Sequence, residues 1–343
     1  MRPPHRWVRR LVLAPLVVAL TAMMVVTSPV WAPVAWALSA VQTGRRRLLR
    51  VLWLVTVYLV METVALFAML GLWIGSGFGW AVRGPGFQRA HYQLCGWVLR
   101  VLYRQACWVL KVSVEITGVT PADAPPQPLL VLSRHAGPGD SFLLAHALIT
   151  WYDREPRIVL KDTLLWDPTI DVLLNRLPNR FLAPGGGDDA LRQIGDLATG
   201  LDTNDALVIF PEGGNFTPER WRKAIDRLRR LGLPAMARKA EKMTNVLAPR
   251  PGGVLAALEA SPAANVIWVA HTGVDHLRTI GDIWRELPMD KVIQTQWWLQ
   301  ESGDIPVGED RRIEWLYAWW ARIDEWISQH RPVPADPAPT PLT

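Results

Sequence analysis

The sequence predicts a layered α/β fold, with a largely parallel sheet flanked by helices, preceded by an N-terminal hydrophobic helical membrane segment. Short continuous apolar runs alternate with helical stretches in the second half of the chain, which is the pattern of buried parallel strands and crossover helices. The first quarter instead holds two long apolar stretches. We therefore divide the 343 residues into a membrane anchor over 1–89, a large domain over 90–330 and a proline-rich, disordered tail over 331–343.

The two apolar stretches of the anchor are each long enough to enter a bilayer. Residues 11–44 contain no charged side chain, and residues 51–82 carry only Glu62. A helix crosses the bilayer core with about 20 apolar residues. Arginines on both sides of the first stretch, and Pro29 and Pro33 within it, leave two arrangements open: two full crossings or a re-entrant hairpin.

A cleaved signal peptide over residues 1–37 is the weaker alternative for the start of the chain. The basic beginning and the small-residue pattern Ala35-Trp36-Ala37 suit it, but the apolar run is far longer than the 7–15 residues of a signal core. We expect the protein at the cell membrane, with the large domain on the cytoplasmic side.

Positive charge is concentrated at the membrane end of the chain. Residues 1–110 hold twelve Arg or Lys and one acidic residue, whereas the remainder holds 25 basic and 30 acidic residues. Basic clusters beside apolar segments attract anionic lipid headgroups, at about 1 kcal/mol per charge. Nineteen tryptophans fit a membrane interface or a packed core. Membrane lipids are therefore expected partners, and nucleic acid is not. Cys95 and Cys107 provide no disulfide framework and suit a reducing compartment.

The elements of the large domain follow one another in α/β order. After a break at 83–86, residues 90–111 predict an amphipathic helix that would lie on a membrane surface or cover a sheet. Further helices are expected at 141–151 and 189–201. Strands are expected at 112–116, 129–132, 157–160, 180–183, 206–210 and 265–270.

Two of these strands end in polar motifs, and functional groups of such sheets collect beyond the carboxyl ends of the strands. The first motif runs Ser-Arg-His-Ala-Gly-Pro-Gly-Asp over residues 133–140. Its glycines and proline allow a tight loop, through which the carboxylate of Asp140 could reach the imidazole of His135. A carboxylate on one ring nitrogen leaves the other nitrogen to act as a general base. The alternatives are an N-cap for Asp140 and a surface position for His135.

The second motif runs Phe-Pro-Glu-Gly-Gly-Asn-Phe-Thr over residues 210–217. It places the carboxylate of Glu212 and the amides of Gly213 and its neighbours at the same edge of the sheet. The amides would hold a developing oxyanion, and the carboxylate would hold a substrate hydroxyl. The alternative for Glu212 is an acidic residue at a helix start or in a loop.

Together the two motifs resemble those of the glycerolipid acyltransferases, in particular the 1-acylglycerol-3-phosphate acyltransferases. The shared pattern is a histidine, four residues and an aspartate, with Phe-Pro-Glu-Gly about seventy residues further along. The resemblance covers residues 90–290, and the hydrophobic start matches the membrane segment of the family. Residues 246–250 and 287–290 are more similar to the eukaryotic-type branch that includes lysocardiolipin acyltransferases.

The chain departs from the family pattern where the family binds the acceptor phosphate. Arg134 replaces the usual Asn before the histidine, and Gly214 and Asn215 replace a Thr-Arg pair. Pro184 replaces an arginine that the family has between the two motifs, and Trp268 replaces a proline that the family has after them. The base residues are thus intact and the phosphate contacts partly missing. Lys161 is the best remaining phosphate ligand by resemblance. The candidate substitutes, each with a surface or structural alternative, are Arg134, Arg180 and Arg250.

The resemblance implies that His135 removes the proton of a lysophosphatidate 2-hydroxyl, and that the oxygen then attacks an acyl thioester. A thiolate leaves readily, so no covalent enzyme intermediate is required. The resemblance implies no cofactor and no metal. It implies an acyl thioester donor, as co-substrate acyl-CoA or acyl carrier protein, and a lysophospholipid acceptor. Another lysophospholipid or a glycolipid is the second choice of acceptor.

Two other function classes remain as alternatives. His271 and His276, with His135 and Asp140, could be imagined as ligands of a hydrolytic metal, although the chain has no His-Glu-x-x-His and no cysteine pair at zinc spacing. On the residues alone, His271 is better explained as the ordinary end of a strand. The altered phosphate motifs also allow a non-catalytic membrane adaptor that binds lipids without converting them.

Overall fold

The computed structural model describes residues 3–41, 46–120, 123, 126–137, 139–182, 187–275 and 280–332. In these residues seven strands form one sheet in the order β1-β7-β6-β2-β5-β3-β4. Every neighbouring pair is parallel except β6 and β7, which run antiparallel. The strands are β1 Val112–Gly118, β2 Leu129–Ser133, β3 Glu155–Lys161, β4 Arg180–Leu182, β5 Asp205–Ile209, β6 Asn265–Thr272 and β7 Lys291–Gln300. The predicted fold class is confirmed.

All six predicted strands are present, and one strand was missed. β7 lies between β1 and β6 and joins the first strand to the rest of the sheet. Its sequence, Lys-Val-Ile-Gln-Thr-Gln-Trp-Trp-Leu-Gln, mixes polar and apolar residues in place of a continuous apolar run. The sheet is buried on both faces at its centre, whereas β7 is only half-buried over most of its length. The polar residues of β7 therefore suit its half-buried position, and they make the strand difficult to recognise from the sequence.

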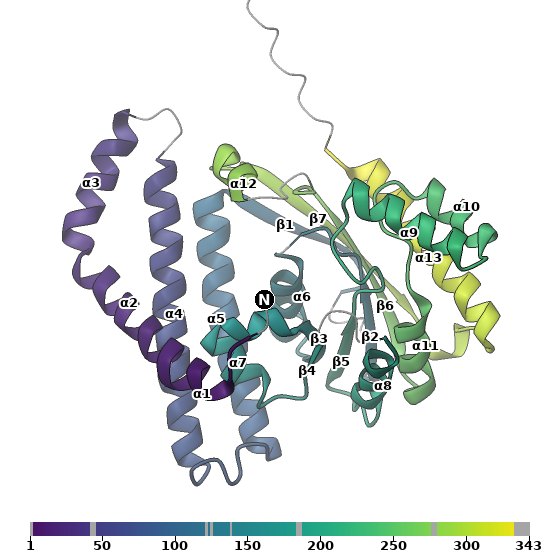
Figure 1. Ribbon diagram of the computed structural model, residues 1–343, viewed down its shortest axis with the longest axis horizontal. Helices are drawn as coiled ribbons and strands as arrows, with labels where there is room; N and C mark the ends of the chain where they lie inside the picture. Colours follow the sequence, from purple (N-terminus) through teal and green to yellow (C-terminus); the bar gives the residue numbers. More distant parts are fainter. Residues whose placement is uncertain are drawn as a thin grey trace, which may run out of the picture.

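Helices cover both faces of the sheet, which divides the interior into two cores (Figure 1). Alternate residues of β2 point to opposite faces. Leu129 and Val131 pack with α6 (Asp140–Thr150), and Leu130 and Leu132 pack toward α8–α11 and α13. The helices of that second face are α8 Gly187–Ala198, α9 Pro218–Arg230, α10 Pro234–Lys242, α11 Pro251–Ala260 and α13 Glu309–His330.

The tryptophans include both buried and exposed side chains. Trp268 of β6 is fully buried and stacks on Trp319 of α13, with ring centroids 4.9 Å apart. Trp320 is buried beside them. Trp80 and Trp108, by contrast, are exposed.

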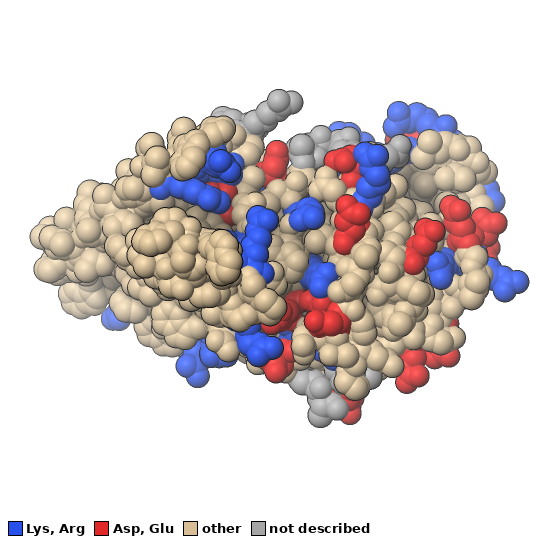
Figure 2. Space-filling model, turned by 90° about the horizontal axis from the view of Figure 1, so that it is seen from below, with Lys and Arg blue, Asp and Glu red and all other residues tan. Residues whose placement is uncertain are grey.

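The predicted anchor forms a layer of long helices beside the domain (Figure 1). The first apolar stretch bends after α2 (Ala14–Val26) and continues as α3 (Ser28–Val41), which contains Pro33. The second stretch forms α4 (Arg47–Gly75). By length and composition, Arg6–Val26 and Arg47–Gly75 are each able to cross a membrane. Figure 2 shows that this end of the molecule is almost bare of charged side chains.

The helix expected over residues 90–111 is α5, which begins earlier, at Pro85, and ends at Leu110. It lies between the apolar helices and the domain, because it packs against α4 on one side and against α6 and β1 on the other. The remaining short elements are α1 Arg6–Val8, the π-helical turn η1 Arg9–Leu13, η3 Asp162–Trp166, α7 Pro168–Leu174, α12 Ile280–Glu286 and η4 Ser302–Asp304.

Ion pairs fasten the start of the chain to the domain. Asp171 of α7 is completely buried, and its two carboxylate oxygens accept hydrogen bonds from Arg9 Nη2 at 2.7 Å and Arg10 Nε at 3.1 Å. At the other end, the guanidinium of Arg47 donates to the carbonyl of Leu287 at 2.8 Å. A buried carboxylate requires hydrogen-bond donors as partners. Arg9 and Arg10 therefore stabilise the fold, in addition to any contact that they make with lipid headgroups. The tail beyond residue 332 lies outside the described residues.

Candidate active site

His135 and Asp140 meet at the carboxyl end of β2, where the strand turns into α6. The imidazole Nδ1 of His135 lies 3.3 Å from Oδ2 of Asp140. No described residue hydrogen-bonds to the other ring nitrogen, Nε2, and the side chain keeps 14% of its surface exposed. The ring of Phe210, at the end of β5, lies 4.7 Å from the imidazole, centroid to centroid. The pair is therefore arranged as the motif spacing predicts.

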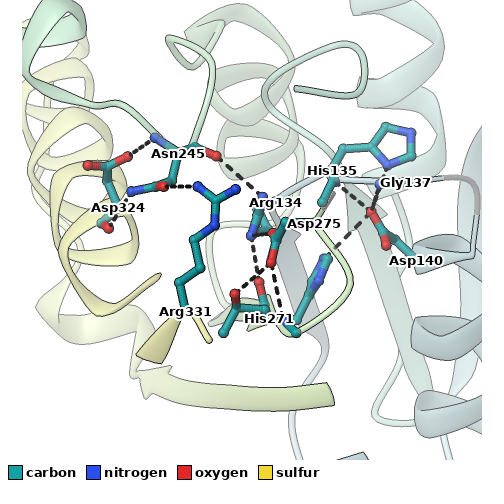
Figure 3. Close-up of polar contacts among 12 residues, drawn as sticks. Arg134, His135, Gly137, Asp140, Asn245, His271, Asp275, Asp324 and Arg331 are labelled. Carbon is teal, nitrogen blue, oxygen red and sulfur yellow. Dashed lines mark hydrogen bonds and ion pairs between the residues drawn. The ribbon is translucent and has the colours of Figure 1, made fainter. Parts of the chain in front are cut away.

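The carboxylate of Asp140 folds the loop before it and does not cap the helix that follows. Asp140 is the first residue of α6, behind the N-cap residue Gly139. Its Oδ2 accepts hydrogen bonds from the upstream amides of Ala136 at 2.6 Å and Gly137 at 2.7 Å. Because these amides belong to the loop that carries His135, the aspartate fixes the position of the imidazole as well as contacting it (Figure 3).

The surroundings of Asp140 keep it ionised. Burial would raise the pKa of this carboxyl, but the neighbouring His271, the contact with His135 and the amide of Gly137 outweigh burial and hold its pKa below the usual value. A carboxylate in contact with Nδ1 fixes the ring tautomer and stabilises the imidazolium that forms when Nε2 takes a proton.

Glu212 lies beneath the His135 loop and binds backbone. Its Oε1 accepts from the amide of His135 at 2.9 Å, and its Oε2 accepts from the amide of Leu247 at 2.9 Å. The residue is 2% exposed. Burial raises the pKa of Glu212 to about 7, against the lowering effects of Arg134 and of these two amides. With both oxygens occupied, Glu212 positions the loop, which corrects the predicted role of holding a substrate hydroxyl.

Replacing Glu212 with glutamine should lower the free energy of unfolding by about 1–3 kcal/mol, because the new NH₂ group faces a backbone N–H and leaves a buried donor unpaired. Urea unfolding followed by tryptophan fluorescence measures the change. Glu259→Gln, at an exposed position of α11, is the matched control and should change stability by less than about 0.5 kcal/mol. Equal stability of the two variants would contradict the conclusion that Glu212 holds the loop through its two hydrogen bonds to backbone amides.

The motif over residues 210–217 also binds the backbone carbonyl of His135. The amide of Phe216 donates to the carbonyl oxygen of His135 at 2.9 Å. The amide of Gly213, in contrast, donates to the carbonyl of Phe210 at 3.0 Å, so it is engaged and does not serve the predicted oxyanion role. The two motifs are thus joined through backbone, which explains why they occur as a pair.

Residues 113–266, which run from β1 into β6 and include both motifs, match the model of a family described as Acyltransferase. The match covers less than half of the 343 residues, and it shows that this segment is similar to acyltransferases. Among solved structures, it is similar to the 1-acyl-sn-glycerophosphate (LPA) acyltransferase PlsC from Thermotoga maritima, with a TM-score of 0.44 and 14% sequence identity, over 78% of this chain and 98% of that chain. A comparison with curated proteins found no match.

Arg250 lies beside Gly213 of the Phe-Pro-Glu-Gly motif. Gly213 adopts a positive φ of 67°, and a Cβ built there would lie 3.1 Å from the guanidinium carbon of Arg250. The amide of Arg250 donates to the carbonyl of Pro211 at 2.9 Å, which fixes the residue at the start of α11. Partial burial and the nearby charge of Arg227 lower the pKa of Arg250.

Lys161 ends β3 and is exposed at the same edge of the sheet. β5 lies between β3 and β2, so Lys161 is two strands away from His135, roughly 10 Å at the usual spacing of strands. Arg180 begins β4 at the opposite end of its strand, since it pairs with Val159 and not with Lys161. Pro184, which stands in place of a family arginine, lies in residues 183–186, outside the described residues.

His271, Arg134 and Asp275 also lie beside the site, in roles that differ from those the sequence suggested for His271 as an ordinary strand end and for Arg134 as a phosphate ligand (Figure 3). His271 of β6 is buried, and its Nε2 lies 3.6 Å from Oδ2 of Asp140. Arg134 is 2% exposed and donates from Nη1 to the carbonyl of His271 at 2.6 Å and to Asp275 Oδ1 at 2.5 Å. The Arg134 pairing lowers the pKa of Asp275 to about 2, although burial acts to raise it. The signal for His271 was its place at the end of a strand neighbouring β2.

Arg134 also explains one departure from the family pattern. Its Nη2 donates to the carbonyl of Asn245 at 3.3 Å, and the amide of Asn245 in turn donates to Asp324 of α13 at 2.6 Å. The guanidinium is therefore engaged in the interior and is not placed to bind a phosphate at the surface. Of the predicted substitutes, Arg250 has the more suitable position.

An apolar pocket opens between α6 and the β1–β7–β6 side of the sheet. Asp140 and His271 line its polar end. The remaining lining is mostly apolar and comprises Val114, Ile116, Leu143, Leu144, Ala147, Trp151, Val269 and Trp297, with Ser133 and Thr295. The pocket therefore brings an apolar lining next to Asp140 and His271. Among the described residues, no group of three or more His, Cys, Asp or Glu is placed to hold a metal ion, and His276 lies outside them.

Proposed function

We propose that this protein is an acyltransferase that moves a fatty acyl group from a thioester donor to the 2-hydroxyl of 1-acylglycerol-3-phosphate, which produces phosphatidate, with His135 as the general base. The observation that supports this most is the 3.3 Å contact of Asp140 with Nδ1, which leaves Nε2 as the ring nitrogen available to a hydroxyl. A general base of this kind contributes about 10²–10⁴ in rate.

In the proposed step, Nε2 of His135 takes the proton of the acceptor hydroxyl while the hydroxyl oxygen attacks the carbonyl carbon of the thioester. The C–O bond forms, and collapse of the tetrahedral intermediate breaks the C–S bond. The thiolate leaves and takes the proton from the imidazolium. Because thiols ionise near pH 8.5, this departure needs little assistance, and the ionised Asp140 stabilises the transient imidazolium.

The surroundings of the site support lipid substrates. The apolar pocket at Asp140 and His271 is suited to the acyl chain of the donor, and the apolar helices α2–α4 would hold the domain at the membrane where the lysolipid resides. A domain on the cytoplasmic side would meet acyl-CoA, which we propose as the donor. The position of Arg250 at Gly213 supports a phosphorylated acceptor, because a guanidinium matches phosphate oxygens in a bidentate manner.

An acceptor panel tests this proposal. Purified protein in lipid nanodiscs is given labelled oleoyl-CoA with lysophosphatidate, lysophosphatidylcholine, lysocardiolipin, monoacylglycerol or a glycolipid. We expect labelled phosphatidate as the main product. Transfer to a different lysophospholipid or to a glycolipid would overturn the assigned acceptor and retain the reaction class. Lipid binding without any acyl product from the whole panel would favour the adaptor.

Replacing Arg250 with methionine should raise KM for lysophosphatidate by about 10- to 100-fold, because one charge-assisted contact to the phosphate is lost. kcat/KM for monoacylglycerol, which has no phosphate, should be unchanged. Arg238→Met, the same change at an exposed position of α10, is the control and should behave as the wild type. An equal effect of Arg250→Met on both acceptors would contradict phosphate binding at this residue.

A further inference from the structure

The carboxylate of Asp140 lies between two imidazole rings. His135 approaches Oδ2 through Nδ1 at 3.3 Å, and His271 approaches the same oxygen through Nε2 at 3.6 Å. Figure 3 shows the His271 ring pointing from β6 toward Asp140. The two histidines come from different strands, since His135 follows β2 and His271 belongs to its neighbour β6. The second ring therefore faces the group that orients the proposed base.

The Nε2 atom of His271 is a buried polar atom with no hydrogen-bond partner among the described residues. The side chain is only 9% exposed, so the ring is surrounded by protein atoms. A buried polar group without a partner costs free energy, so the nearest acceptor is expected to accept a hydrogen bond from Nε2. That acceptor is Asp140, and hydrogen bonds in catalytic sites often tighten only when substrate is bound.

The charges around His271 favour the neutral ring. Burial lowers the pKa of His271, and the charge of Arg134 lowers it further, while Asp140 and Asp275 act in the opposite direction without reversing the shift. A neutral ring carries one hydrogen. If Nε2 lacked it, a lone pair would face a carboxylate oxygen, so the stable tautomer has the hydrogen on Nε2.

We propose that His271 is a positioning residue that donates its Nε2–H to Asp140, so that one carboxylate is shared between two imidazoles. This inference rests on the proposed function, in which Asp140 supports His135 as the base. Sharing has a definite consequence, because a carboxylate that also accepts from His271 offers less negative charge to the imidazolium of His135. His271 thereby makes His135 easier to deprotonate and sets the pH above which the base is active.

The groups that face this arrangement come from each neighbouring element. His135 and Arg134 follow β2, Asp140 begins α6, Asp275 follows β6, and Glu212 follows β5, where the charge of Asp140 acts to raise its pKa. Each of these five groups can affect the pH dependence of the reaction. The effect of His271 is therefore measured by comparing two substitutions at position 271, both of which leave the five groups unchanged.

The test compares His271→Gln with His271→Met, because the side chains have similar size and neither titrates. Glutamine retains an N–H donor near the position of Nε2, and methionine removes it. We expect His271→Gln to keep the pH profile of kcat/KM close to that of the wild type. In His271→Met the acidic limb should move to higher pH by about one unit, which is a loss of about tenfold below the limb and little loss above it. Equal losses at all pH values in both variants, or an unchanged limb in His271→Met, would overturn the proposal.

A second measurement does not depend on turnover. In protein labelled with ¹⁵N-histidine and held in micelles, the resonances lost in His271→Gln identify the ring of residue 271. We expect its Nε2 to carry the hydrogen and to show a hydrogen-bonded shift, and we expect Asp140→Ala to abolish that shift. A ring protonated on Nδ1 would overturn the proposal even if acyl transfer is confirmed. A hydrogen-bonded Nε2–H in a protein inactive toward every acceptor would instead refute the proposed function and retain the contact.

Discussion

His135→Ala should lower kcat for acyl transfer by at least about a hundredfold, the lower end of what a general base contributes. The ring contacts Asp140 through Nδ1 and makes no other hydrogen bond with a described side chain, so its removal leaves the loop amides bound to Asp140 and Glu212. The fold should therefore survive while the reaction slows. Initial rates of labelled lipid formation at saturating substrates measure the effect.

His330→Ala is the control for this experiment. His330 is exposed at the end of α13, where its ring stacks on Trp326, far along the chain from the site residues. Its loss should leave kcat within about twofold of the wild type, as is usual for a surface substitution. If His135→Ala retains full activity, the base has been assigned to the wrong residue and the proposed mechanism fails.

Arg134→Met should lower the free energy of unfolding by about 3–5 kcal/mol, which is the cost of leaving one partner of a buried ion pair without the other. Arg134 is 2% exposed, and its ion pair with Asp275 is 2.5 Å long. The same guanidinium binds the carbonyls of His271 and Asn245, so the substitution also leaves two buried acceptors with fewer donors. Urea unfolding in micelles measures the loss.

A double-mutant cycle with Asp275→Asn separates the ion pair from the rest of this effect. If the pair carries the stability, Arg134→Met costs much less in the Asp275→Asn background than in the wild type, because no uncompensated carboxylate remains. Additive losses would show that the two charges do not act together, and the structural role of Arg134 would then rest on its two carbonyl contacts alone.

The sequence was sufficient for the parts of this molecule that follow from local pattern. The strand after Asp205 and the strand of Leu129–Ser133 are continuous apolar runs, so their burial and parallel pairing could be expected. The contact of His135 with Asp140 was predictable for a similar reason. The two residues lie in one short loop, and glycines within it permit the turn.

Features that depend on distant segments could not be read in this way. β7 pairs in parallel with β1, 179 positions earlier in the chain at Val112 and Lys291, and its mixed composition gives no clear pattern. The role of Glu212 depends on the amide of Leu247, and that of His271 on the loop after β2. The motif indicated correctly that Glu212 lies at the sheet edge. Its hydrogen-bond partners depend on tertiary packing, and they are backbone amides in place of the expected substrate hydroxyl.

The most direct test of the account is a stoichiometry measured on one preparation. Wild-type protein and His135→Ala in nanodiscs are given radiolabelled acyl-CoA and lysophosphatidate, and released CoA thiol and labelled phosphatidate are counted together. The account predicts one phosphatidate for each thiol in the wild type and almost none of either in the variant. Thiol released without lipid product, or equal product from both proteins, would contradict it.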